Sequence, residues 1–226
     1  MKEPFMYFYI PGLPLHVVYT WLLMIVLVAV SLVIKRSLQW APAGGQNFSE
    51  TFFGGLLDLI DNVMGRGGRA YFPLLATLGI YIFASNLMGL IPGMFSPTAN
   101  INTTASCAIT VFLMTHYVGV KTHGWGYLKQ FTGPIWWLAP LMVVIELIGH
   151  LARPLSLSVR LFGNIFGKEQ VIVNIFVLSL LFKFLWVPVL APSLILVFAI
   201  FMSFIQAFVF VLLAMIYLAG ALEEHH

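Results

Sequence analysis

Long apolar stretches with very few charged residues limit this chain to one class of fold. Hydrophobic residues make up 61% of its 226 residues, and only 8% are charged. Soluble domains carry about 25% charged residues, whereas a membrane-spanning helix needs about 20 consecutive apolar residues. The short alternating strands of a membrane β-barrel are not seen in the sequence. We therefore predict an all-α, multi-pass protein that forms a single membrane domain over residues 1–226.

The hydropathy pattern predicts about five membrane-embedded helices and one amphipathic helix at the membrane interface. The embedded helices are expected at residues 15–34, 71–91, 102–120, 135–182 and 189–219, and the interfacial helix at residues 48–64. The interfacial position follows because acidic residues such as Glu50 and Asp58 interrupt the apolar residues of that segment.

The last two embedded segments are longer than a membrane crossing requires. Residues 189–219 span about 45 Å as a helix, whereas the hydrocarbon core of a bilayer is about 30 Å thick. Residues 135–182 are longer still, and Pro140 and Pro154 can kink that helix. Both helices are therefore expected to be tilted and to form an antiparallel hairpin.

Basic residues predict the orientation of the chain, because Lys and Arg accumulate in cytoplasmic loops. They cluster in two loops, at Lys35, Arg36, Arg66 and Arg69, and at Lys121 and Lys129. Two spans lie between these loops and return the chain to the same side of the membrane. The sequence thus predicts an N-terminus outside and a C-terminus in the cytoplasm, with Lys183 as a minor exception.

Charge and cysteine content argue against other kinds of protein. The net charge of +3 is too small and too scattered to indicate a nucleic-acid partner. Cys107 is the only cysteine, so neither an internal disulfide nor a cysteine-based metal site can form. We expect no bound metal and no cofactor.

Arg160 is the most informative residue in the apolar part of the chain. Its guanidinium stays charged at any physiological pH, and a charge placed within the membrane costs at least about 2.5–3.5 kcal/mol. An intramembrane charge is therefore a hypothesis for a functional site. The structural alternative is that Arg160 pairs with Glu146 or with backbone carbonyls.

Further polar residues accompany this arginine within residues 135–182. They recur at helical spacing, every seven residues at Glu146, Arg153 and Arg160, and every four residues at Ser156, Arg160, Asn164 and Lys168. Each set falls close to one helix face, which lines a water-filled path or a protein interface and does not face lipid. For Ser156 and Asn164, hydrogen bonding between helices is an alternative role. Arg153 and Lys168 are expected to anchor the helix at the membrane surface or to snorkel toward it.

Three more residues are candidates for the same site. His150 follows Glu146 by four positions, and it either lines a channel or packs as a histidine of the core. Glu169 lies about 13 Å along the helix from Arg160, where a carboxylate beside an aqueous pocket can accept and release protons. Gln206 can hydrogen-bond Arg160 across the hairpin. The histidines near the ends of other spans are expected to be solvated: His16, His116 and His123.

Several motifs closely resemble subunit a of F-type ATP synthases. The first is Arg160-Leu-Phe-Gly-Asn164, preceded by Arg153-Pro-Leu-Ser156 and followed by Glu169. Glu146 matches another acidic position of that family. The remaining motifs are Gln206-Ala-Phe-Val-Phe210 with Tyr217-Leu218, Asn86-Leu-Met-Gly-Leu-Ile-Pro-Gly93 and Pro97-Thr-Ala-Asn-Ile-Asn-Thr-Thr104. Together they cover about residues 15–220.

The resemblance implies a stator that stands beside a rotating ring of c subunits in a bacterial plasma (inner) membrane. Protons would enter one aqueous half-channel, neutralise a ring carboxylate, travel with the ring and leave through the other half-channel. The residue that matches Arg160 separates the two half-channels. The positions that match Asn164, Glu169 and Gln206 line the proton path or support the arginine, and Glu146 lies on the cytoplasmic side.

The resemblance also implies the partners of the chain. These are the c-subunit ring, the b subunits of the peripheral stalk and the lipid bilayer, and the transported species is the proton. The chain itself would be a non-catalytic, ion-translocating subunit. Two positions depart from the family pattern. Ala199 stands where some members have a histidine paired with the position of Glu169, and Asn100 replaces an acidic residue.

Two other functions remain as alternatives. A secondary transporter would bind its own substrate between broken helices, but neither an internal repeat nor a matched pair of interrupted helices is seen. An intramembrane enzyme could use Glu146 and His150 as acid and base, but the sequence contains no HExxH motif. Neither alternative explains the two overlong helices.

Overall fold

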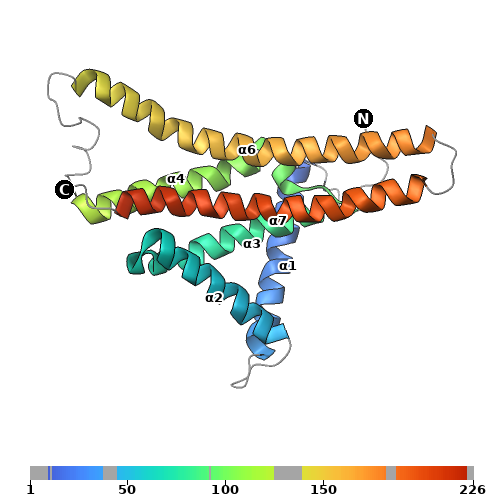
Figure 1. The fold of residues 1–226 in the computed structure, drawn as a ribbon, viewed down its shortest axis with the longest axis horizontal. Coiled ribbons are helices and arrows are strands. Elements are labelled where there is room, and N and C mark those ends of the chain that lie inside the picture. The colour runs from blue at the N-terminus through green and yellow to red at the C-terminus, as the bar shows by residue number, and fades with distance from the viewer. Residues whose placement is uncertain are drawn as a thin grey trace.

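The computed structural model describes residues 10, 12–37, 45–91, 93–124, 139–181 and 187–222 (Figure 1). The side chains at positions 37, 139–140, 169, 172, 176, 178–181 and 187–192 lie outside this description. The prediction of an all-α, multi-pass membrane protein is confirmed. Five helices are long and apolar enough to cross a membrane, and none of the described residues forms a strand.

The elements follow one another as α1 (Leu15–Ser37), α2 (Gly45–Met64), the 3-10 helix η1 (Arg66–Tyr71), α3 (Phe72–Met88), the 3-10 helix η2 (Pro97–Ala99), α4 (Ile101–His123), α6 (Ala139–Leu181) and α7 (Val187–Leu222). The helix expected over residues 71–91 ends at Met88, and turns follow it. Of the segment expected over residues 135–182, the positions 135–138 and 182 lie outside the described residues.

Local chemistry explains several helix ends. Asn100 caps α4, because its side-chain oxygen accepts a hydrogen bond from the backbone N–H of Asn102 at 2.9 Å. Pro73 lies in the first turn of α3, where its missing N–H and fixed φ are tolerated. Lys35 and Arg36 lie in the last turn of α1, where cations offset the negative end of the helix dipole. These two basic residues therefore extend α1 beyond the apolar span.

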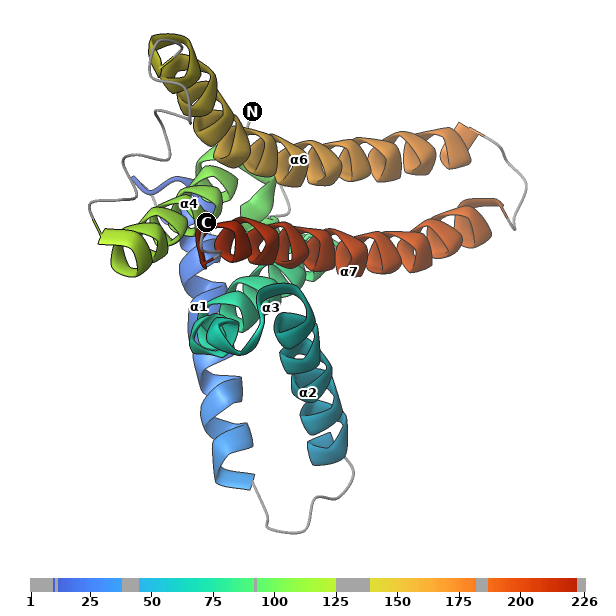
Figure 2. The same ribbon diagram turned by 60° about the vertical axis from the view of Figure 1, so that its left-hand side comes forward.

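The hairpin of α6 and α7 dominates the shape of the molecule. With 43 and 36 residues, these helices are about 65 Å and 54 Å long. They run antiparallel and side by side, and both cross the direction of α1 (Figures 1 and 2). Helix α6 contains Pro154 and is bent along its length. Both helices exceed the thickness of a bilayer core by about twofold.

The hydrophobic core lies where the C-terminal part of α7 packs against α3 and α4. Phe210, Ala214, Met215 and Leu218 of α7 are all fully buried there. The approach of α3 to α7 depends on a small residue, because a Cβ added at Gly79 would lie 2.9 Å from a methyl carbon of Val211. Helix α7 is therefore fixed to the rest of the bundle through its second half.

The N-terminal part of α7 is much more exposed than its C-terminal part. Leu194 and Val197 are 65% and 69% exposed, and the first buried side chain among the described residues of α7 is Ala199. The C-terminal end of α6 and the N-terminal end of α7 extend past the ends of α3 and α4 (Figure 1). These two helix ends therefore stand clear of the other helices.

An ion pair joins α2 to η1 at the surface. Arg69 donates from Nε to Oδ1 of Asp61 at 2.8 Å, and this hydrogen bond lowers the pKa of Asp61 below its usual range. Because the folded pKa is lowered, the stabilisation is complete above the unfolded pKa, about 4, and is lost only as the pH falls through the folded value. Titration of Asp61 therefore contributes nothing to pH effects near neutrality.

Candidate functional site

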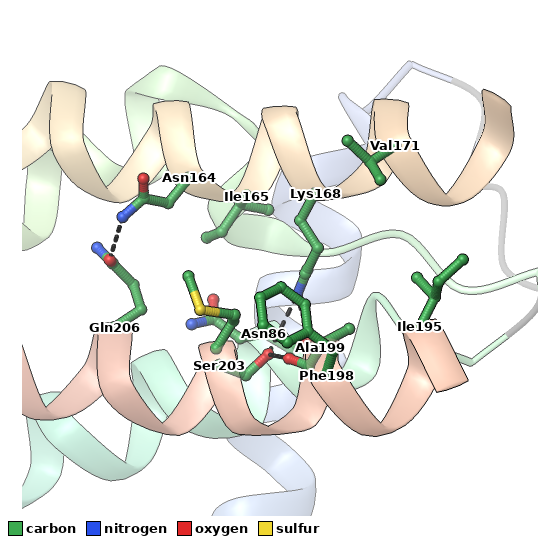
Figure 3. A pocket seen from close by; sticks show the side chains of 11 residues that line it. Asn86, Asn164, Ile165, Lys168, Val171, Ile195, Phe198, Ala199, Ser203 and Gln206 are labelled. Atoms are coloured by element: carbon green, nitrogen blue, oxygen red, sulfur yellow. Dashed lines mark hydrogen bonds between the residues drawn. The ribbon is translucent and has the colours of Figure 1, made fainter. Parts of the chain in front are cut away.

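A cavity of about 220 Å³ lies between the two long helices, with α3 behind it (Figure 3). Apolar residues of α6 and α7 form most of its wall. Its polar lining comes from three helices, with Asn86 on α3, Asn164 and Lys168 on α6, and Ser203 and Gln206 on α7. Its volume and its polar groups are sufficient to hold water.

Hydrogen bonds cross this cavity from α6 to α7. Asn164 donates from Nδ2 to Oε1 of Gln206 (Figure 3). One turn further along α6, the ammonium of Lys168 donates to Oγ of Ser203 at 3.1 Å and to the main-chain carbonyl of Asn86 at 3.3 Å. Lys168 thus points into the cavity, whereas the sequence suggested a membrane anchor. Its positive charge stands between two oxygen acceptors.

Asn86 connects the cavity to a buried polar network behind it. Its side chain is fully buried, and Oδ1 accepts a hydrogen bond from Thr98 at 2.9 Å. Thr98 also contacts Ser85 and Ser96, at 3.2 Å and 2.9 Å, so the end of α3 and the turn η2 are held together. Among the described residues, Nδ2 of Asn86 has no hydrogen-bond partner. A buried amide of this kind favours water in the adjoining cavity.

A second polar cluster lies between the N-terminal part of α6 and the C-terminal parts of α4 and α7. Nε2 of His150 lies 3.2 Å from Oε1 of Glu146, and the His150 ring stands 5.2 Å from the ring of His116 on α4. Arg153 lies over the ring of Tyr217 at 5.6 Å. His150 is buried, whereas the Glu146 side chain is 39% exposed. The cluster therefore connects an exposed carboxylate with a buried imidazole.

Arg160 lies on α6 between the two clusters. It is ten residues from His150 and eight from Lys168, or about 15 Å and 12 Å along the helix. Its side chain is exposed and makes no hydrogen bond or ion pair with any residue that the structure describes. Glu146 pairs with His150 and Gln206 with Asn164, so neither forms the pair with Arg160 that the sequence allowed.

The other predicted residues are placed as follows. Glu169 belongs to α6, but its side chain lies outside the described residues. Ser156 is exposed, and it is Ser158 that is buried and contacts Thr104 of α4 at 3.2 Å. Ala199 is 1% exposed and lines the cavity.

Sequence reasoning missed two members of these clusters. His116 was expected to be solvated, yet it stands beside His150 and receives the edge of Phe112 at 4.3 Å. Asn86 was noted only as part of a motif, and its place in the cavity wall depends on how α3 packs against the hairpin. The i+3 spacing of Ser203 and Gln206 was a usable signal, because both residues face the cavity.

Fold and site together define a multi-pass α-helical membrane protein whose polar groups gather along its two longest helices. The sequence profile of the family described as ATP synthase A chain matches residues 17–219. This chain belongs to that family, which functions in ATP synthesis and proton transport in membranes.

Curated relatives named ATP synthase subunit a cover nearly the whole chain. The protein of Geobacter sulfurreducens is 52% identical over 221 residues, which are 94% of this chain and 93% of the relative. The protein of Trichlorobacter lovleyi is 55% identical over 210 residues, or 93% of this chain and 88% of the relative. A protein of Syntrophotalea carbinolica named ATP synthase subunit a 1 is 54% identical over 215 residues, or 95% and 88%.

Proposed function

We propose that the chain is the proton-conducting stator of an F-type ATP synthase in a bacterial inner membrane. It supplies two aqueous half-channels to the carboxylates of a c-subunit ring, and Arg160 separates them. The b subunits of the peripheral stalk hold it in place. The chain catalyses no reaction of its own and couples proton flow to rotation.

One observation carries this proposal: two polar clusters flank an exposed arginine along a single helix. Asn164, Lys168 and Gln206 line a cavity with room for water on one side of Arg160. Glu146 and His150 form the cluster on the other side. Because the guanidinium cannot give up its proton at physiological pH, it opposes the passage of a cation from one cluster to the other. It can pair transiently with a carboxylate on a partner that passes its exposed face.

The orientation of the half-channels follows from the basic loops. With the N-terminus outside and the C-terminus in the cytoplasm, Glu146 and His150 belong to the cytoplasmic half-channel. Lys168 and Ser203, near the closed end of the hairpin, then belong to the outer one. The lengths of α6 and α7 support steep tilting, because each helix is about twice as long as the bilayer core is thick.

The proposed function is tested by passive proton flux through the assembled membrane sector in lipid vesicles. Vesicles that contain the c-ring, the stalk subunits and this chain should conduct protons down an imposed pH gradient. Matched vesicles with the ring and stalk subunits alone should not. Equal flux in the two preparations would remove this chain from the proton path.

A substitution at Glu169 tests the outer half-channel. Glu169→Gln should lower the proton flux of the assembled complex about tenfold or more, because an amide cannot take up and release a proton at this point. Assembly should be retained, since the two side chains have nearly the same shape. Flux is measured between about pH 6 and pH 9, and an unchanged rate throughout would exclude Glu169 from the path.

A further inference from the structure

Two histidines from different helices stand side by side in the second polar cluster. The ring centroids of His116 on α4 and His150 on α6 are 5.2 Å apart, with the ring planes inclined by 33°. The edge contact with Phe112, at 4.3 Å, restricts the His116 ring from its own helix. His150 is in turn held by the contact of its Nε2 with Glu146. Both rings are therefore fixed at positions where a proton can pass between them directly or through one water.

The groups around this pair determine how many protons it can hold. Helix α6 contributes Glu146 and Arg153, and α7 contributes Tyr217, whose ring lies under the Arg153 guanidinium. The uncharged Thr115 of α4 joins His150, Arg153 and Tyr217 around a small void. The Glu146 carboxylate favours a positive charge on His150, whereas Arg153 opposes the accumulation of a second one. The pair can therefore carry at most one excess proton at a time.

We propose that His116 and His150 form a two-imidazole proton relay between Glu146 and the α4 side of the bundle. This inference rests on the proposed function and adds His116 as a proton-relay residue. Imidazole suits this task because it titrates near neutral pH and has two ring nitrogens, so it can accept a proton on one and release a proton from the other.

For each proton that enters the relay, one proton leaves it. A protonated Glu146 carboxyl gives its proton to Nε2 of His150, and the Nδ1 proton of His150 passes to a nitrogen of His116. His116 then releases a proton from its other nitrogen to water. Both imidazoles are then neutral again, and each regains its starting tautomer by exchanging protons with water. Reversing the steps carries protons in the opposite direction.

The test uses the assembled membrane sector in lipid vesicles, as for the proposed function, with alanine variants of the two histidines. His150→Ala and His116→Ala should each lower the passive proton flux at about pH 7–8 by about tenfold or more. Because the two groups act in series, the double variant should be no slower than the slower single variant. Imidazole added to the buffer should restore part of the flux, since it supplies the missing acid–base group.

A matched control comes from the same helix. His123→Ala removes the histidine at the end of α4, seven residues beyond His116, and should leave both the flux and its pH profile unchanged. Glutamine variants of the pair keep polarity and size without the acid–base chemistry. They should behave like the alanine variants but should gain little from imidazole.

Two results would overturn the relay. One is wild-type flux in both single variants. The other is a reduced flux with an unaltered pH profile and no response to imidazole, which would make the pair a packing contact only. Should His150→Ala fail to assemble, the half-buried His116 decides the matter through its own variants. If wild-type vesicles conduct protons and the histidine variants conduct them equally well, only the relay is rejected. If wild-type vesicles do not conduct protons, the proposed function is rejected.

Discussion

Arg160→Ala should abolish ATP-driven proton pumping and ATP synthesis, by about a hundredfold or more, while the complex still assembles. The reason is the position of the residue between the two polar clusters. Without its permanent charge, no charged residue remains on α6 between Arg153 and Lys168. Under the proposed function, a proton could then cross between the half-channels without turning the ring. The exposed side chain makes no hydrogen bond or ion pair with the described residues, so its loss should cost the fold of this chain little.

Two fluxes measured side by side distinguish the gate from other roles. ATP-driven pumping and passive leak are recorded in vesicles that carry wild type, Arg160→Ala and Arg160→Lys. We expect lost pumping with a persisting or enlarged leak in the alanine variant. The lysine variant keeps the charge but not the planar fork of donors, so it should block the leak better than it supports pumping. Pumping that survives in Arg160→Ala would reopen the secondary-transporter alternative.

A substitution that fills the cavity should give the second largest loss of proton transport. Ala199 lines the cavity and is buried, so a phenyl group at this position must occupy part of the cavity or displace a helix. Ala199→Phe should therefore lower proton flux about tenfold or more, because water and the polar lining lose contact with each other. Some loss of stability is expected as well, since overpacking costs about 1–3 kcal/mol.

A graded series separates blockage from general damage. Flux and the yield of assembled complex are measured for Ala199→Ser, Ala199→Val and Ala199→Phe. If the cavity conducts protons, flux per assembled complex should fall as side-chain volume rises. A phenylalanine variant that assembles and conducts like wild type would show that the proton path avoids this cavity, and the outer half-channel would have to be sought elsewhere.

The fold class could be predicted because hydropathy alone determines it. Apolar runs of membrane length leave few alternatives to helices, and the overlong final segments already indicated a hairpin. The ends of the helices were harder to predict from hydropathy. Hydropathy places a boundary where charge appears, yet α1 includes Lys35 and Arg36 because cations are favourable in a last helical turn.

The site could be predicted only where its members share one helix. The contact between Glu146 and His150 follows from their i, i+4 spacing, which puts them on one face. Contacts between helices depend on how each helix is rotated about its axis, and the sequence of a mostly apolar helix leaves that rotation open. His116 and Lys168 were misjudged for this reason, since only packing turns them toward α6 and the cavity. The role of Glu169 stays a prediction.

The uneven anchoring of the hairpin has a mechanical consequence. Gly79 and the buried face around Phe210 clamp the second half of α7, whereas Leu194 and Val197 near the closed end are exposed. The described part of the hairpin is therefore held where α7 packs against α3 and α4 and is exposed on the far side of the cavity. A sideways force on the exposed part of α7 would reach the core by way of the cavity, where the Asn164–Gln206 hydrogen bond joins the two helices.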